Sequence, residues 1–396
     1  MTTASLGGRA TVRIPRAQTV DLSAALDSVT ELHERLGVPV TTRADHVATW
    51  SRLTRTPVTA VIVPGPDGLR AAALLTVRRR GPLLDVRLAL DGIADEQRLP
   101  ACDQGAAEEL AGQVVRLLDH APLWRLDLEQ LQPGNPVLAH LETVLASRGP
   151  VAVGAGDVLP EVRWSGGRPS EGWSRKKTRQ KVRQAARRLD ESGRPWNLER
   201  LLDPDAVRAA LPATLALREE REVALGRADD LADPRRRELH TALVERHLER
   251  GAVELWQLTV SGELVMYAIA VADGENGEVR RLVDSRMRPG AEELSAGILL
   301  FGRMLQAWYA DGRVEVVDLG RGLNDFKRQI HTGDRPTAHL RAWSHPALAR
   351  AEDVTRAGAE TLRMRLRHLR DSSSAAAATV RTMRRLQNRR RGTPVT

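Results

Sequence analysis

The 396-residue chain has little cysteine, phenylalanine, tyrosine or lysine, and each shortage is informative. Its single cysteine, Cys102, excludes an internal disulfide and a cysteine-based metal site, and fits a reducing cytoplasm. With two Phe and two Tyr, the cores must be built from Leu, Val, Ala and the eight Trp. No segment has the roughly 18 apolar residues of a membrane span, and the N-terminus lacks the apolar core of a signal peptide. We therefore expect a cytoplasmic globular protein without a transmembrane segment.

Lysine is the most informative shortage. Of the 60 basic residues only four are lysine, namely Lys176, Lys177, Lys181 and Lys327. The compact ammonium of lysine is not interchangeable with the planar guanidinium of arginine at a tight anion or carbonyl site. Chance would explain four remaining lysines, but the clustering of three of them favours a function. We therefore treat residues 174–188 and 320–328 as candidate functional segments.

The net charge of +9 is unevenly distributed. Residues 175–188 contain eight basic residues and no acidic one, and the segment from Pro346 onward contains twelve Arg and four acidic residues. Because each segment has a net charge of +8, the rest of the chain has a net charge of about −7. Two basic patches on an acidic body indicate local recognition of anions rather than uniform binding of nucleic acid.

The order of predicted elements indicates an internal duplication of one α+β unit. Each half has two helices, then three strands joined by turns, then a helix and a further strand. The first half ends with one more helix, and the second half ends with the Gly320–Arg328 segment and a last strand. The expected helices are 21–36, 43–52, 104–120, 135–147, 204–226, 234–250 and 292–311, and the expected strands are 58–63, 69–77, 83–90, 123–131, 252–260, 264–272, 279–283, 314–319 and 338–343.

A basic helix is predicted between the two halves, over residues 174–192, with Ser174 as its N-cap. Cations in the first turn of a helix oppose its macrodipole. The arrangement is understandable if these cations and the free N–H groups bind a phosphate together. The simpler interpretation is a solvated charged surface. One face of the helix is apolar (Val182, Ala185, Ala186 and Leu189), and another is polar (Lys177, Lys181, Gln184 and Arg188).

The second candidate segment follows a predicted strand that ends at Asp318. Two glycines, Gly320 and Gly322, allow a tight turn, and Lys327 follows in a short helical turn. A lysine in this position can polarise a carbonyl or bind a phosphate. By itself the pattern fits a glycine-rich turn with a solvated lysine equally well.

Three stretches together resemble a known family. They are Asp318-Leu-Gly-Arg-Gly with Phe326-Lys-Arg, the basic helix Lys176–Gly193, and Leu294-Ser-Ala-Gly-Ile-Leu-Leu. In sequence, order and spacing they are similar to the motifs of the GNAT-type acyltransferases of the CelD, or cellulose-biosynthesis acetyltransferase-like, family. The Gly322-Leu-x-x-Phe-Lys piece is also similar to the Fem-type aminoacyl-tRNA-dependent transferases. The resemblance covers residues 174–344 and extends to the first half through element order alone.

The resemblance implies tandem GNAT-like units, each a mixed, mainly antiparallel sheet flanked by helices. Their expected bounds are 1–165 for a degenerate unit, 166–345 for the catalytic unit and 346–396 for an Arg-rich helical tail. It implies acetyl-CoA or another acyl-CoA as co-substrate, a small-molecule, sugar or peptide amine as acceptor, and no metal. Lys327 and Arg321 would face the acyl donor, Asp318 would hold the turn, and Asp284 is a candidate general base. The implied donor-binding residues are Lys176, Lys177, Lys181, Arg188, Ser295, Gly297 and Arg328.

Two other functions remain open. No frame within Arg288–Gly297 fits the basic-x-x-Gly-x-Gly/Ala loop that binds coenzyme A in GNAT enzymes, which keeps charged tRNA as an alternative donor. A binding protein that retains the fold without the chemistry is the third possibility. Glu219 or Glu222 could bind the acceptor amine, although such a run is usually a solvated helix face. His240 and His247, two helical turns apart, are expected to be surface-exposed and not to bind metal.

Overall fold

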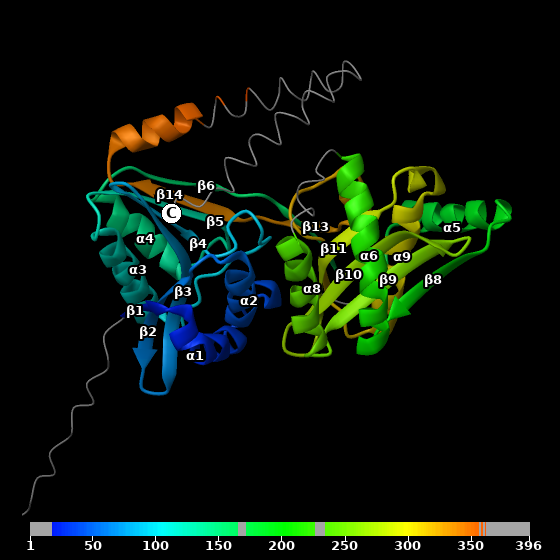
Figure 1. Cartoon of the computed structure of the whole chain (residues 1–396), viewed down its shortest axis with the longest axis horizontal. Helices are drawn as coiled ribbons and strands as arrows, with labels where there is room; N and C mark the ends of the chain where they lie inside the picture. Colours follow the sequence, from blue (N-terminus) through cyan, green and yellow to red (C-terminus); the bar gives the residue numbers. More distant parts are fainter. Residues whose placement is uncertain (1–17, 165–171, 226–233, 356–357, 359–360, 362–396) are drawn as a thin grey trace, which may run out of the picture.

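The computed structural model describes residues 18–164, 172–225, 234–355, 358 and 361. They form two lobes side by side, each built on a seven-stranded sheet (Figure 1). Both sheets are mixed, with one parallel strand pair among antiparallel ones. The predicted α+β class with two similar units is confirmed.

The first sheet has the strand order β1-β2-β3-β4-β5-β14-β6. Helices α3 (Gln104–Leu118) and α4 (Pro136–Ala146) cover one face, and α1 (Leu22–Arg35) and α2 (Ala44–Thr54) cover the other. Each face buries its own apolar cluster, built mainly from Leu, Val and Ala. The strands are β1 (Gln18–Asp21), β2 (Thr59–Gly65), β3 (Gly68–Arg80), β4 (Leu83–Leu88), β5 (Leu123–Leu131), β6 (Val151–Ala155) and β14 (Ala338–Trp343).

The second sheet has the strand order β13-β7-β12-β11-β10-β9-β8. Helices α5 (Lys176–Glu191) and α9 (Ala296–Asp311) pack on one face, and α6 (Pro204–Ala224) and α8 (Pro234–Leu248) pack on the other. A short helix, α10 (Asp325–Ile330), follows the end of β12. The strands are β7 (Leu159–Arg163), β8 (Trp196–Leu201), β9 (Val253–Val260), β10 (Glu263–Asp273), β11 (Val279–Met287), β12 (Val316–Asp318) and β13 (Gly333–Arg335).

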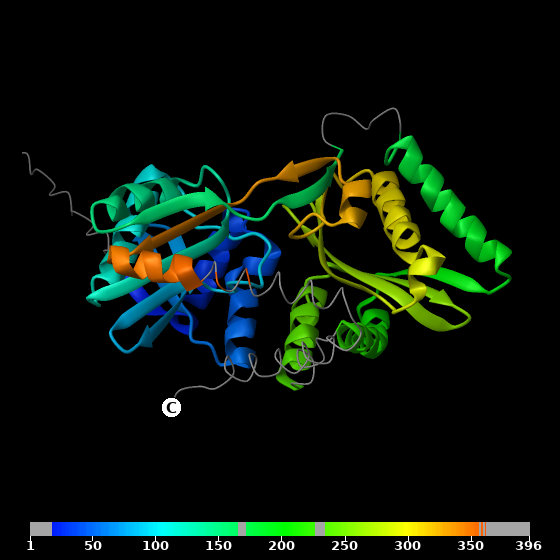
Figure 2. The same ribbon diagram turned by 90° about the horizontal axis from the view of Figure 1, so that it is seen from above.

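The two halves exchange strands. β7 precedes the second half in sequence but lies in the second sheet, between β12 and β13. β14 follows the second half but lies in the first sheet, between β5 and β6. Figure 2 shows these two segments crossing between the lobes. A division at residue 165 therefore separates two halves that each contribute one strand to the other's sheet.

Each half contains an Arg–Asp pair at the same place in its sheet. The parallel pair β4–β5 aligns Arg87 with Asp127, and the parallel pair β11–β12 aligns Arg281 with Asp318. Each pair is the last in its register before the strands part, and in each half the Arg and the Asp are both followed by Leu. Corresponding residues at corresponding positions support descent of both halves from one unit.

Most expected elements lie within a few residues of their predicted bounds, with three corrections. The predicted strand 279–283 continues to Met287, and the predicted helix 292–311 is broken at Ser295. Strands β1, β6, β7, β8 and β13 were not predicted, because they are short or exposed and lack an apolar alternation. Of the predicted tail helices, residues 346–355 are helical, and most of the remainder lies outside the described residues.

A buried pair of histidines lies where the lobes meet, between α2 and α8. The rings of His46 and His247 have centroids 5.4 Å apart. Three of their four ring nitrogens have no hydrogen-bond partner within the described ranges. The neighbouring carboxylate of Asp45 already pairs with Arg250 at 2.5 Å and with Arg246 at 3.2 Å. Burial therefore lowers the pKa of His46 to about 3 and that of His247 to about 4.

We expect the folded protein to lose stability as the pH falls below about 6.5, the pKa of an unfolded histidine. A histidine that is neutral when folded contributes its full stability above this pH. The contribution is lost on acidification, at about 1.4 kcal/mol per pH unit and residue. The loss ends near the folded pKa values of about 3 and about 4. Urea titrations at a series of pH values would measure the slope.

The matched control for this prediction is the double variant His46→Gln/His247→Gln. It removes both titrating rings and keeps a polar side chain at each position. Between about pH 7.5 and 5 the wild-type protein should lose about 4 kcal/mol more than the variant. Equal slopes for both proteins would contradict the assignment of the acid sensitivity to this pair.

Candidate functional site

The basic helix α5 is held against α9 by a narrow apolar stripe. Val182, Ala185 and Leu189 are buried, as predicted, and Ala186 is partly buried. Gly302 of α9 permits the close approach, since a Cβ there would overlap Val182. The predicted N-cap Ser174 is wrong, because the helix is preceded by Arg175, which makes no side-chain capping bond.

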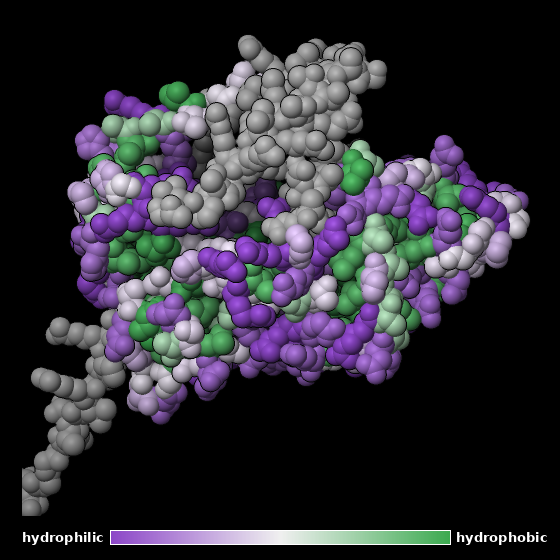
Figure 3. All heavy atoms as spheres, viewed as in Figure 1, coloured by the Kyte–Doolittle hydropathy of each residue, from purple (hydrophilic) through white to green (hydrophobic). Residues whose placement is uncertain are grey.

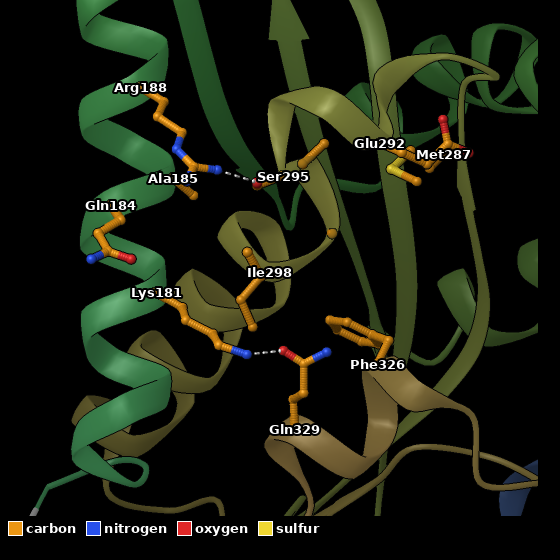
Figure 4. A pocket seen from close by; sticks show the side chains of 12 residues that line it. Lys181, Gln184, Ala185, Arg188, Met287, Glu292, Ser295, Ile298, Phe326 and Gln329 are labelled. Atoms are coloured by element: carbon orange, nitrogen blue, oxygen red, sulfur yellow. Dashed lines mark hydrogen bonds between the residues drawn. The ribbon is translucent and has the colours of Figure 1, made fainter.

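A pocket of about 590 Å³ opens between α5, the start of α9 and α10 (Figure 4). Lys181 and Arg188 of α5 reach into it from one side. The ammonium of Lys181 donates to Oε1 of Gln329 at 2.6 Å, and Nη1 of Arg188 lies 3.4 Å from Oγ of Ser295. The lining residues are Lys181, Gln184, Ala185, Arg188, Met287, Glu292, Ser295, Ala296, Gly297, Ile298, Phe326 and Gln329.

The N-terminus of α9 forms the floor of this pocket. Ser295 has a left-handed backbone, with φ of 56°, and separates the 3-10 turn Ala291–Leu294 from α9. Its side chain does not cap the helix. Gly297 has no neighbouring atom closer than 3.9 Å to a built Cβ, so its backbone is open to a ligand. A helix N-terminus with two nearby cations suits an anion such as a phosphate.

Four of the seven predicted donor-binding residues line this pocket, namely Lys181, Arg188, Ser295 and Gly297. The other three, Lys176, Lys177 and Arg328, are exposed and do not line it. Gln329 and Met287 also line the pocket but were not predicted, because they lie on elements separated in sequence from the basic helix. No local pattern marked either residue.

The strands β11 and β12 part next to the pocket. They pair over only three residues, 279–281 with 316–318, and β11 then continues to Met287. Within the described part of the chain, residues 283–287 have no strand partner on the β12 side. A bulge against β10 leaves Val283 out of register, between the pairs Ala270–Leu282 and Ile269–Asp284. Unpaired strand edges can bind an extended ligand through backbone hydrogen bonds.

The Gly320 turn lies at the other end of this unpaired edge. Oδ1 of Asp318 accepts a hydrogen bond from the Gly320 amide at 2.9 Å, as the predicted role in the turn requires. The ammonium of Lys327 donates to the carbonyl oxygens of Gly320 and Arg321, at 3.0 and 2.9 Å. Burial lowers the pKa of Lys327, against the attraction of Asp95 and Asp318. Lys327 therefore holds the turn and does not line the pocket.

We expect Gly320→Ala to destabilise the protein by about 1–3 kcal/mol, through a strained backbone and a close contact. Gly320 has φ of 74°, and a Cβ there would lie 3.0 Å from Oδ2 of Asp95. Gly322→Ala is the matched control, because Gly322 has φ of 79° but no atom within 4 Å of a built Cβ. Thermal unfolding of both variants separates the cost of the left-handed backbone, which both share, from the cost of the contact with Asp95, which only Gly320→Ala makes. Equal losses would contradict the close packing of Asp95 on the turn.

The turn also binds the first lobe. Nη2 of Arg321 donates to the carbonyl oxygen of Gly92 at 3.0 Å, so this predicted donor-facing residue contacts the first half. Oδ2 of Asp318 pairs with Arg281 at 2.5 Å and with Arg335 at 2.8 Å. Both arginines also pair with the buried Glu96 of the first half, at 3.3 and 2.6 Å. Asp318 is thus part of a buried charge network between the lobes.

Asp284, the predicted general base, is buried under α6 and α8. Its carboxylate pairs with Arg286 at 2.7 Å and Arg218 at 3.0 Å, and accepts from the Tyr267 hydroxyl at 2.6 Å. Burial favours the neutral acid, but Arg286 and Arg218 outweigh it and hold the pKa of Asp284 below its usual range. A carboxylate with two guanidinium partners is a weak proton acceptor.

The acidic residues of α6 are also paired. Glu219 binds Arg237 at 2.8 Å, and the buried Glu222 binds Arg286 at 3.3 Å. The predicted exposure of the two histidines is wrong, since His247 is buried and His240 mostly so. The reason is that α8 is covered on both sides, by β9 of its own lobe and by α2 of the other.

Within the described residues, one group of side chains is close enough to share a metal ion: Asp127, Glu129 and His339 of the first lobe. Nε2 of His339 and Oδ1 of Asp127 lie 2.5 Å apart, as direct hydrogen-bond partners. The group lies on β5 and β14, and none of its residues lines the pocket. None of the helices within the described ranges is both long and apolar enough to span a bilayer.

Residues 176–328 match a family model described as an acetyltransferase (GNAT) domain. This match bears out the prediction of an acyltransferase domain in the second half, and it leaves the narrower CelD family unconfirmed. Comparison of the sequence with curated proteins gives no match.

Solved structures with a similar fold cover both lobes. One is the C-terminal domain of a putative lysylphosphatidylglycerol synthetase from Agrobacterium fabrum, with 14% identity, TM-score 0.51, and 81% of this chain and 92% of that chain covered. Another is FemX, with 11% identity, TM-score 0.52, and 82% and 96% covered. A third, a protein of unknown function from Bacteroides thetaiotaomicron, has 12% identity, TM-score 0.50, and 82% and 98% covered. At these identities the likeness concerns the fold.

Proposed function

We propose that the second half is the catalytic unit of an N-acyltransferase, which transfers an acyl group from a coenzyme A thioester to an amine. The observation that supports it most is the continuity of the pocket with the unpaired edge of β11. Phosphates at the start of α9 would meet Lys181, Arg188 and the helix N-terminus. Met287 lies both in the pocket and at the end of β11.

The unpaired edge would hold the extended arm of the donor. Residues 283–287 span about 17 Å as a strand, at about 3.3 Å per residue. An arm that follows them from Met287 would bring its thioester to the Gly320 turn. Backbone N–H groups of the unpaired β11 edge would stabilise the oxyanion, and Lys327 would fix the Gly320 turn beside it. Catalysis then consists of orienting donor and amine, stabilising the oxyanion and removing a proton.

A charged tRNA is the second candidate donor, and one observation favours it. Lys176, Lys177, Arg183 and Arg187 are exposed on α5, outside the pocket. Figure 2 shows α5 along the outer edge of the second lobe, where a long polyanion could lie. Such binding would give a steep salt dependence, about −0.7 in the log–log slope for each phosphate contacted on a single strand.

A donor screen by mass spectrometry tests the proposal. The full-length chain is incubated with acetyl-CoA and longer acyl-CoAs, or with charged tRNAs, in the presence of a panel of small amines and amine-bearing peptides. Formation of an acylated amine and free coenzyme A supports the proposal. Transfer from charged tRNA alone favours the second candidate, and no transfer from any donor would favour a binding protein without chemistry.

A further inference from the structure

A carboxylate of the first lobe reaches the Gly320 turn. Asp95 lies in the segment between β4 and α3, outside the unit that matches the acetyltransferase domain. A Cβ built on Gly320 would lie 3.0 Å from Oδ2 of Asp95 and 3.6 Å from the carbonyl oxygen of Leu282. The Asp95 carboxylate, the turn and the β11 backbone therefore meet at one point.

This point is the end of the unpaired edge of β11. Arg281 is the last residue of β11 that pairs with β12, and Leu282 follows it. A donor arm that enters at Met287 and follows β11 ends at Leu282. The reacting carbonyl would then lie next to Gly320 and Asp95.

Asp95 is partly buried and differs from the buried carboxylates Asp284 and Asp318. Asp284 and Asp318 each have two arginine partners within 4.0 Å, whereas Asp95 has no such ion pair among the described residues. Burial raises the pKa of Asp95, and the nearby carboxylate of Asp318 adds to this rise. The hydrogen bond from the Arg321 amide and the positive charges of Arg321 and Lys327 only partly offset it. A carboxylate without a directly paired cation retains the ability to accept a proton.

We propose that Asp95 is the catalytic proton acceptor of the transfer reaction, supplied by the first lobe to a site in the second. This inference rests on the proposed function. The amine nitrogen attacks the thioester carbon, the C–N bond forms and the C–S bond breaks. Asp95 takes the proton from the nitrogen and passes it to solvent, and the leaving thiolate takes a proton from water. The active site is therefore complete only when both lobes are present.

The test is the ratio of kcat for Asp95→Asn to kcat for the wild-type protein, measured at a series of pH values with an acyl-CoA and an acceptor found in the donor screen. The ratio cancels the titration of the acceptor amine itself. We expect a loss of about 100-fold or more at alkaline pH, the usual contribution of a general base. Towards acid pH the ratio should rise to about one, because the wild-type carboxyl becomes protonated. The KM for the acyl-CoA should stay within about twofold.

Asp157→Asn is the matched control, since Asp157 also belongs to the first half and lies near the turn, 3.7 Å from Nε of Arg321. It should keep the wild-type kcat. A ratio for Asp95→Asn that is one at all pH values, or that is low and independent of pH, would overturn the proposal. The second result would mean that Asp95 only packs against the turn. A wild-type protein that transfers no acyl group would overturn the proposed function as well.

Discussion

Reversing the charge of Lys181 and Arg188 together is expected to weaken the binding of coenzyme A at least about 100-fold. Both side chains reach into the pocket at the start of α9. A hydrogen bond between charged groups contributes about 1.5–3 kcal/mol, and the loss of two such bonds corresponds to a factor of 100 or more. Lys181→Glu/Arg188→Glu also places two negative charges beside the phosphates. Isothermal titration with coenzyme A would measure the loss.

Arg183→Glu/Arg187→Glu is the matched control, because it makes the same change in net charge on the same helix. Arg183 and Arg187 are exposed and do not line the pocket. This variant should bind coenzyme A within about threefold of the wild-type protein at about 0.15 M salt, where exposed charges are largely screened. If both variants lost affinity equally, α5 would act through its overall charge, and the pocket would not be the phosphate site.

Replacing Asp318 by Ala is expected to reduce the free energy of unfolding by about 3–5 kcal/mol. The carboxylate is buried and neutralises Arg281 and Arg335, at 2.5 and 2.8 Å. Its removal leaves both guanidinium groups with a reduced set of partners in the interior, and the Gly320 amide loses its acceptor. Urea unfolding followed by circular dichroism would measure the change.

Two further variants are compared with Asp318→Ala, one that removes only the charge of Asp318 and one at an exposed aspartate. Asp318→Asn keeps an acceptor for the Gly320 amide but removes the charge, so it should fall between the wild-type protein and Asp318→Ala. Asp334→Ala removes a carboxylate of the neighbouring strand β13 whose side chain is 44% exposed, and should change stability by less than about 0.5 kcal/mol. Similar values for Asp318→Ala and Asp334→Ala would contradict the role of the buried network.

The sequence predicted the local elements well, because helices and strands follow short-range patterns. The apolar stripe of α5 and the strand Ala338–Trp343 are examples. The partner of that strand could not be predicted, since nothing local in its sequence distinguishes the first sheet from the second. The same limit applies to β7, which is five residues long and joins the sheet of the other half.

The candidate site was predicted only in part, because local sequence patterns do not show which distant segments lie together. The rarity of lysine marked the two segments that border the site, around Lys181 and Lys327. It did not predict that Lys181 faces the pocket while Lys327 holds the Gly320 turn, which depends on the directions of α5 and α10. Asp95 carried no signal at all, because it is one of many aspartates and becomes distinctive only through its contact with the other lobe.

The exposed apolar residues do not form a single large patch on the described surface. On the face seen in Figure 3, hydrophilic residues predominate and apolar residues form separate patches. Exposed large apolar side chains are scattered along the described chain, with Ile93 and Val223 each 55% exposed. Since isolated exposed apolar residues are common in soluble proteins, they do not point to a further binding surface.

Hydrogen–deuterium exchange with and without coenzyme A tests the central claim most directly, because it locates the donor on the chain without requiring the acceptor. We expect protection of the first turn of α9, of residues 283–287 in β11 and of the pocket side of α5. Peptides from α3 in the first lobe, which is remote from the pocket, should be unchanged. Protection that is absent from both α9 and β11 would contradict the placement of the donor in this pocket and along this strand edge.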